Sequence, residues 1–150
     1  MDYAVWLRDH LIKEQKPDLA QIRSQLNRAS KDLLTAEAVL SVDRTWSFTI
    51  AYHATMRACK GLMYSKGFLP TKINPHKTIL AFAYSIFGDE SRNFFLRLDR
   101  MRRRRHDFIY DAENDMTKSE ARFAISTARE LIEKIRWIIE KEKMNGLSIK

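Results

Sequence analysis

The sequence predicts an all-α fold, an up-and-down bundle of four or five helices. Apolar residues recur at spacings of three and four along most of the chain, which is the pattern of amphipathic helices. Turn-forming residues are scarce, because the 150 residues include only four glycines and three prolines. A many-stranded sheet needs more turns than this composition provides. We expect one domain over residues 1–150, with a core at about 18–143.

The first long helix is predicted to start at Leu19. Pro17 followed by Asp18 is a helix-start signal, and a shorter helical segment over residues 3–14 is expected before it. The apolar residues that follow form the single stripe of an amphipathic helix. They are Leu19, Ile22, Leu26, Ala29, Leu33, Ala36 and Leu40.

The second helix is predicted to run to about Lys66, with Asp43 or Thr45 as its N-terminal cap. Gly67 stands where a helix often ends in a left-handed residue. Apolar side chains lie around most of the circumference of this helix. We therefore expect it to be the most buried helix of the bundle.

Two further helices follow a segment, residues 68–74, that is expected to be a loop. Pro75 suits the first position of a third helix, and Gly88 ends it. A fourth helix is predicted from residues 90–91 to Tyr110, because no glycine or proline interrupts that stretch.

The fifth helix follows a polar connection at residues 111–116. Thr117 or Ser119 can cap it, and Glu120 completes a capping box with Thr117. The helix is predicted to end near residues 145–146, where a glycine follows an asparagine.

The positive charge of the chain is concentrated in one segment. Between Arg97 and Arg105 there are six arginines and one acid, Asp99, so +5 of the net charge of +8 lies there. A planar guanidinium suits bidentate recognition of phosphate, and the run therefore favours an anionic partner. The structural alternative is a solvated helix face or an ion-pair surface between subunits.

The arginine run leads into a histidine and a tyrosine. On a helix, Arg102, His106 and Tyr110 share one face, and Arg105 lies beside His106. Cleavage of RNA without a metal needs a base, an acid and a cation, and this patch offers those side chains. The alternative interpretation is structural, with His106 near a helix end and the Tyr110 hydroxyl anchoring the bundle.

The order and spacing of four short motifs between about Ile22 and Glu140 resemble those of HEPN domains. These motifs are Tyr52-His53-Ala54 with Lys60-Gly61-Leu62, the Gly-Phe-x-Pro segment from Gly67, His76-Lys77, and Arg105-His106-x-x-x-Tyr110-Asp111. The resemblance implies a helical bundle that forms a homodimer. It also implies RNA or nucleotide binding. Many members are metal-independent endoribonucleases, often toxins encoded beside a minimal nucleotidyltransferase antitoxin.

The resemblance also implies a set of catalytic residues. RNases of the family pair an Arg and its polar follower with a His after four to six intervening residues. In the preferred alignment Arg105 and His106 are the first two, and Tyr110 stands in place of the catalytic His. A phenol with a pKa of about 10 is a poor base at neutral pH. In an alternative alignment, Arg100 pairs with His106 as the base.

Phosphate or nucleotide binding is predicted for the neighbours of these residues: Arg102, Arg103, Arg104, His76 and Lys77. His76 and Lys77 open a helix, whose N-terminus favours anions. His53 lies in the most hydrophobic predicted helix, where a core histidine is expected; the alternative is that in a dimer it faces the cleft. The single cysteine, the histidine spacing and the absence of a glycine-rich loop predict neither a metal site nor a cofactor.

The same residues leave a second function open, a non-catalytic module whose arginine-rich face docks an acidic partner protein such as a nucleotidyltransferase. The second and third predicted helices also carry more aromatic side chains than one small bundle easily buries, which independently predicts a homodimer. No uncharged stretch is long enough to cross a membrane, and the single cysteine suits a reducing compartment, so we expect a cytoplasmic protein.

Overall fold

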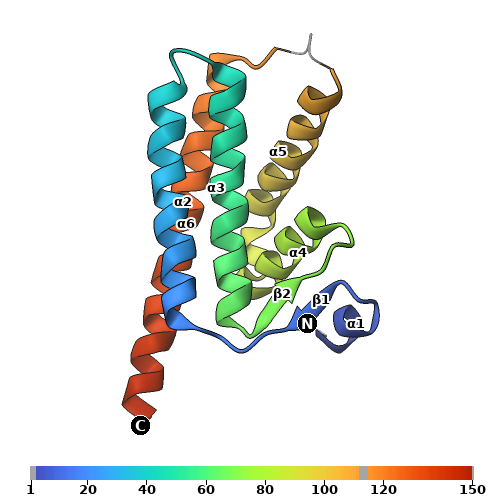
Figure 1. Ribbon diagram of the computed structural model, residues 1–150, viewed down its shortest axis with the longest axis vertical. Helices are drawn as coiled ribbons and strands as arrows, with labels where there is room; N and C mark the ends of the chain where they lie inside the picture. Colours follow the sequence, from blue (N-terminus) through green and yellow to red (C-terminus); the bar gives the residue numbers. More distant parts are fainter. Residues whose placement is uncertain (1–2, 112–114, 150) are drawn as a thin grey trace.

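Helices make up most of the chain, as the sequence predicts. The computed structural model describes residues 3–111 and 115–149, and it describes only the backbone of residues 109, 110 and 144–149. In chain order the elements are α1 (Tyr3–Arg8), β1 (Ile12–Glu14), α2 (Leu19–Val39), α3 (Arg44–Ser65), β2 (Phe68–Pro70), α4 (Pro75–Phe87), a 3-10 turn (Asp89–Ser91), α5 (Arg92–Tyr110) and α6 (Lys118–Ile149) (Figure 1). No helix in the described ranges combines the length and the apolar character needed to span a bilayer.

The predicted capping residues begin and end the helices of the structure. The carboxylates of Asp18 and Asp43 each accept a backbone N–H of the first turn at 2.9 Å, and the Thr117 hydroxyl accepts one at 3.1 Å. Gly67 and Gly88 follow α3 and α4 with φ angles of +89° and +85°. The side chains of Asp18, Asp43 and Thr117 thus satisfy backbone N–H groups that the first turn of a helix leaves unpaired.

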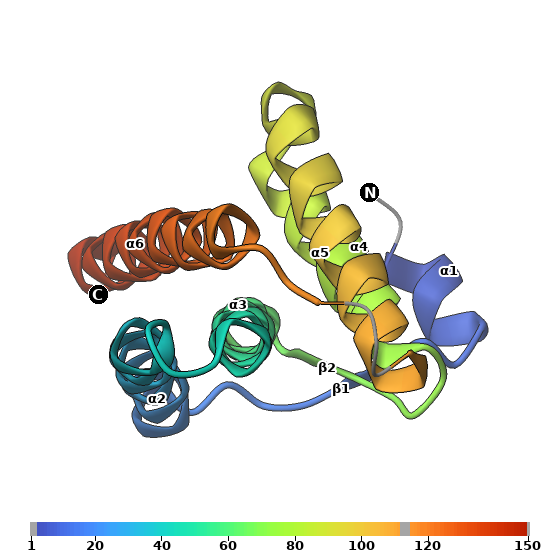
Figure 2. The ribbon, with the colours of Figure 1, turned by 90° about the horizontal axis from the view of Figure 1, so that it is seen from above.

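Helix α3 lies at the centre of the molecule, which confirms that it is the most buried helix. It contacts α2, α6, α4, α5 and β2, and Tyr52, Leu62 and Met63 are fully buried. Seen from above, α2 and α6 lie on one side of α3, and α4 and α5 lie on the other (Figure 2). The buried Ser47 hydroxyl donates to the Ala36 carbonyl at 2.6 Å and ties α3 to α2.

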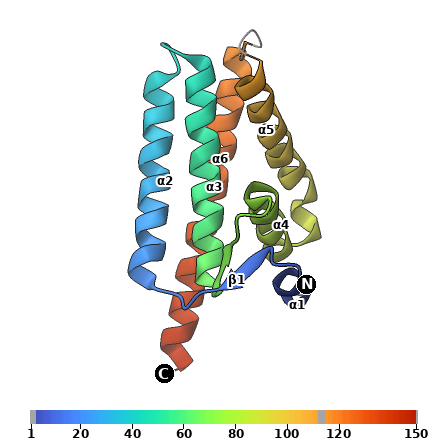
Figure 3. The same ribbon diagram turned by 45° about the vertical axis from the view of Figure 1, so that its right-hand side comes forward.

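Two expectations for the N-terminal half are wrong. The helical segment predicted over residues 3–14 ends at Arg8, and part of the loop predicted over residues 68–74 is a strand. Strands β1 and β2 pair antiparallel, with Ile12 opposite Pro70. Figure 3 shows β1 beside the lower end of α3. Each strand has only three residues, which is too short for an alternating pattern to be visible in the sequence.

The far end of α6 also differs from the prediction. The helix continues to Ile149 rather than ending near residues 145–146. A glycine inside a helix costs only about 1 kcal/mol relative to alanine, so Gly146 does not force an end.

Helix α1 covers part of the aromatic surface that the sequence leaves in excess. The Tyr3 ring stacks on Phe82 with centroids 5.2 Å apart and lies 4.9 Å from Phe68. Trp6 also packs against Phe82, at 5.7 Å. The N-terminal segment thus buries aromatic rings within the chain itself.

Gly61 offers a test of the packing between α2 and α3. It lies inside α3, and a Cβ atom there would sit 3.6 Å from the Gln25 Cβ and 3.7 Å from a Leu26 methyl group, which is ordinary contact. Because alanine favours the helix, we expect Gly61→Ala to raise the free energy of unfolding by about 0.5–1 kcal/mol. Urea denaturation measures the change.

A matched glycine substitution should act in the opposite direction. Gly88 has open space around it but a φ of +85°, which disfavours any side chain. We expect Gly88→Ala to cost about 1–3 kcal/mol. Destabilisation by Gly61→Ala would mean that α2 and α3 cannot accommodate even a methyl group.

Candidate functional site

The first turn of α4 and the last turns of α5 enclose a hollow of about 430 Å³. We call it the arginine pocket. Its lining residues are Asn74, Pro75, His76, Lys77, Arg102, Arg105 and His106. The pocket therefore brings together five residues that the sequence singles out, from two helices. The Tyr110 side chain lies outside the described residues.

Tyr52 of α3 is fully buried and contacts two of the residues that line this pocket. Its hydroxyl is hydrogen-bonded to His76 Nδ1 at 2.6 Å, and the Arg105 guanidinium lies 5.3 Å from the centre of its ring. Burial raises the pKa of the Tyr52 phenol well above its usual value, although Arg105 and Arg102 oppose the shift. The phenol therefore keeps its proton at neutral pH, and the tautomer of His76 sets which of the two groups donates in their hydrogen bond.

Two features of the arginine pocket leave hydrogen-bond donors without acceptors. The Arg105 Nε is buried and has no partner among the described residues. Asn74, at the N-cap of α4, has a left-handed backbone (φ 41°) and makes no side-chain capping bond. A helix N-terminus carries a partial positive charge, so donors and field both favour an anion here.

The other arginines of the run have different partners. Arg102 and Arg103 both donate to Asp99, at 2.9 Å and 2.6 Å. Arg104 donates to Glu120 at 3.1 Å. The hydrogen bonds from Arg103 and Arg102 outweigh partial burial and hold the pKa of Asp99 below its usual range. Among the predicted phosphate ligands on α5, Arg102 lines the arginine pocket, whereas Arg103 and Arg104 do not.

The alternative pair, Arg100 and His106, is not brought into one hollow. Arg100 lines a separate depression together with Phe48 and Phe123, whereas His106 lines the arginine pocket. Arg105 and His106, the preferred pair, line the same hollow.

A second hollow, of about 570 Å³, adjoins the first. We call it the lysine pocket. Its charged and imidazole side chains are Lys13, His53, Arg57, Lys60, Lys72 and His76. Sequence reasoning did not assign Lys13, Lys60 or Lys72 to a site, because they come from β1, α3 and the turn before α4. Only the tertiary fold places them together, although Lys60 belongs to a motif of the resemblance.

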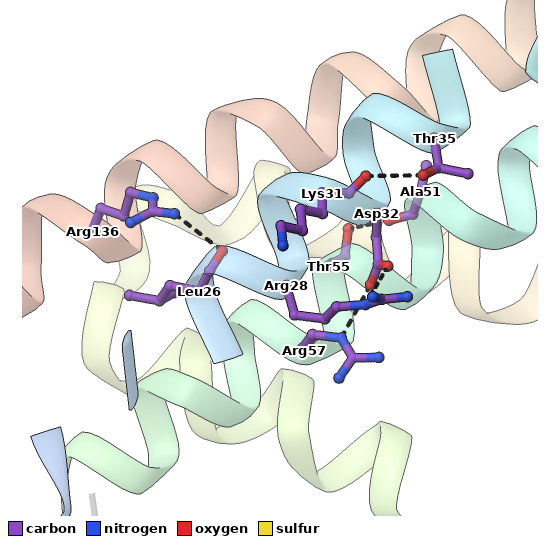
Figure 4. A network of polar contacts seen from close by, with 9 residues as sticks. All are labelled: Leu26, Arg28, Lys31, Asp32, Thr35, Ala51, Thr55, Arg57 and Arg136. Atoms are coloured by element: carbon purple, nitrogen blue, oxygen red, sulfur yellow. Dashed lines mark hydrogen bonds and ion pairs between the residues drawn. The ribbon is translucent and has the colours of Figure 1, made fainter. Parts of the chain in front are cut away.

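Arg57 of the lysine pocket is held by a buried carboxylate. Asp32 of α2 accepts from Arg57 at 3.0 Å and from Arg28 at 3.1 Å (Figure 4). Figure 4 also shows Arg136 of α6 donating to the Leu26 carbonyl, at 3.1 Å. These contacts fix α2 against α3 and α6, and they orient Arg57 toward the hollow.

The expectation that His53 is a core histidine is wrong, because its side chain is exposed at the lysine pocket. The helix is hydrophobic around most of its surface, so periodicity could not identify its one open strip. Partial burial and the charges of Arg105 and Arg57 lower the pKa of His53. Burial, Arg105 and His53 lower the pKa of His76.

These shifts predict how stability depends on pH. Below about pH 6.5 the unfolded chain protonates both histidines while the folded chain resists, so unfolding takes up protons and acid destabilises the fold. We expect the wild type to lose more stability between about pH 7.5 and pH 5.5 than the His53→Gln/His76→Gln variant. Urea unfolding at the two pH values measures this. Equal losses in both proteins would contradict the assignment.

A comparison with known families gives a result that agrees with this geometry. The family model described as HEPN domain matches residues 22–139, a span that begins in α2 and ends in α6. A search of curated proteins finds no match to this chain. The matched span includes every residue of the arginine pocket. It covers more than half of the 150 residues, and the chain therefore belongs to the HEPN family.

Proposed function

We propose that this protein binds RNA or nucleotides through a phosphate group held in the arginine pocket. The observation that carries the proposal is the meeting of His76 and Lys77 with Arg102, Arg105 and His106 around one hollow. No carboxylate belongs to the described residues that line it. An anion entering this hollow meets cations and a helix N-terminus, and the Asp99 carboxylate, which pairs with Arg102, lies outside the lining.

A phosphate supplies the hydrogen-bond acceptors that the donors of the arginine pocket lack. A phosphate offers acceptor oxygens to Arg105, whose Nε has no acceptor among the described residues. Stacking against the Tyr52 ring limits the orientations of the guanidinium, which lowers the entropy lost on binding. Net hydrogen bonds to charged groups contribute about 1.5–3 kcal/mol each.

Binding should depend on Arg105 far more than on an arginine outside the pocket. We expect Arg105→Ala to weaken binding of a fluorescent single-stranded RNA by about 10-fold or more at low salt. Fluorescence anisotropy measures the affinity. Circular dichroism establishes that the variant is folded.

Arg103→Ala is the matched control, because it removes the same charge from the same helix. Arg103 is exposed and pairs with Asp99 rather than lining the pocket. We expect its effect to be about 2-fold, the share of a screened surface charge. Equal losses in the two variants would mean that the whole arginine run binds diffusely, and no RNA binding by the wild type would refute the proposal.

Cleavage of the bound RNA is a second candidate function, favoured by two imidazoles in one pocket. A neutral imidazole can remove the ribose 2′-hydroxyl proton, and that of His76, with its lowered pKa, offers a free Nε2 for this when its Nδ1–H donates to Tyr52. The 2′-oxygen then attacks phosphorus, the bond to the 5′-oxygen breaks, and an acid such as His106 protonates that oxygen. Arg105 and Arg102 line the same hollow, which supports a role for them in stabilising the charge on the phosphoryl oxygens.

This chemistry predicts products as well as rates. In EDTA the wild type should cut RNA to 2′,3′-cyclic phosphate ends, and His76→Gln and His106→Ala should each slow cleavage by about 100-fold or more. Gel analysis of end-labelled RNA measures both. The same oligonucleotide with deoxyriboses should bind but remain intact. Absence of cleavage by the wild type would leave a binding module without catalysis.

The partner is part of the same proposal. We propose a homodimer that acts as the toxin of a toxin–antitoxin pair with a nucleotidyltransferase, as the family membership suggests. If RNA and nucleotides fail to bind while an acidic partner protein binds in an Arg105-dependent manner, the docking module is the better function.

A further inference from the structure

The two pockets share a wall. Pro75 and His76 line both the arginine pocket and the lysine pocket. The 2.6 Å hydrogen bond between His76 and the buried Tyr52 holds this wall in place. A ligand that fills the arginine pocket therefore reaches the lysine pocket by passing over the side chains of Pro75 and His76.

The lysine pocket carries positive charge that the protein itself does not neutralise. Lys13, Lys60 and Lys72 are exposed and make no salt bridge with any described carboxylate. No acid is among the described residues that line the hollow. Lys60 and Arg105 both contribute to the lowered pKa of His76, so the two groups of cations act on the shared wall together.

The two hollows differ in the chemistry of their walls. The arginine pocket has Pro75 as its apolar residue, and its other described lining residues are polar or charged. The lysine pocket is larger and adds Met56, Pro70 and Ile79. A phosphate needs donors alone, whereas a nucleobase needs an apolar surface for its face and polar groups at its edges.

We propose that a segment of single-stranded RNA of two or more nucleotides lies across the wall formed by Pro75 and His76. One phosphate occupies the arginine pocket, and the adjoining nucleotide, with its base on the apolar floor, occupies the lysine pocket. This inference rests on the proposed function and specifies its ligand as a polynucleotide rather than a mononucleotide.

The test compares a mononucleotide with a short strand. Affinities for AMP and for a fluorescent single-stranded RNA tetranucleotide are measured with the wild type and with Lys60→Ala/Lys72→Ala. We expect the variant to bind AMP within about 2-fold of the wild type but to bind the tetranucleotide about 10-fold more weakly. The slope of log K against log salt should fall by about 1.4 for two lost phosphate contacts.

The charge-matched control is Lys31→Ala/Lys118→Ala, which removes two exposed lysines that line neither pocket. Equal effects of the two double variants on the tetranucleotide would overturn the inference, because net charge alone would explain them. Arg105→Ala separates this failure from failure of the proposed function. If Arg105→Ala weakens the tetranucleotide and the lysine variant does not, phosphate binding in the arginine pocket stands and the second subsite is refuted.

Discussion

The buried hydroxyl of Tyr52 must find a hydrogen-bond partner, and much of the site follows from how this need is met. A fully buried phenol has lost its hydrogen bonds to water, and only a hydrogen bond within the protein can replace them. His76 provides that bond, which fixes the first turn of α4 against α3. The aromatic ring of the same residue provides a second contact, because Arg105 of α5 packs against it. One side chain thus sets the positions of an imidazole and a guanidinium from two other helices.

The arginine run is a single feature in the sequence but has several roles in the structure. Asp99 takes two of the guanidinium groups, those of Arg102 and Arg103, and Glu120 takes that of Arg104. These pairs are partly exposed, so each contributes little to stability, but together they decide where uncompensated charge remains. Arg97, Arg100 and Arg105 make none of these ion pairs, and of the three Arg105 is the one that lies beside the uncapped N-terminus of α4. The local net charge of the run therefore suggests a broader anion-binding surface than the structure has, because Arg103 and Arg104 lie outside the arginine pocket.

Periodicity and capping chemistry were enough to predict α2 to α6, because Asp18, Asp43 and Pro75 act on their own backbone neighbourhood. The clustering of Arg105 and His106 on α5 was predictable for the same local reason. The lysine pocket was not, since its residues are far apart in sequence and meet only through the β1–β2 pairing. The partners of Arg103 and Arg104 were equally hidden, because a carboxylate's choice among neighbouring arginines depends on side-chain geometry. His53 was misjudged because overall hydrophobicity does not reveal which strip of a helix is open.

The two-stranded sheet has a consequence for the order in which the protein folds. Helices α2 and α3 lie between Ile12 and Pro70 in the sequence, so the pairing of these two residues closes a long loop. The contacts between α2 and α3, by contrast, join consecutive helices. Contacts of high sequence separation are entropically costly and tend to form late. The residues that line the arginine pocket all lie between positions 74 and 106, so this pocket does not require the β1–β2 contact. The lysine pocket is complete only when β1, which carries Lys13, has paired with β2. The arginine pocket and the lysine pocket therefore depend on contacts of different sequence separation.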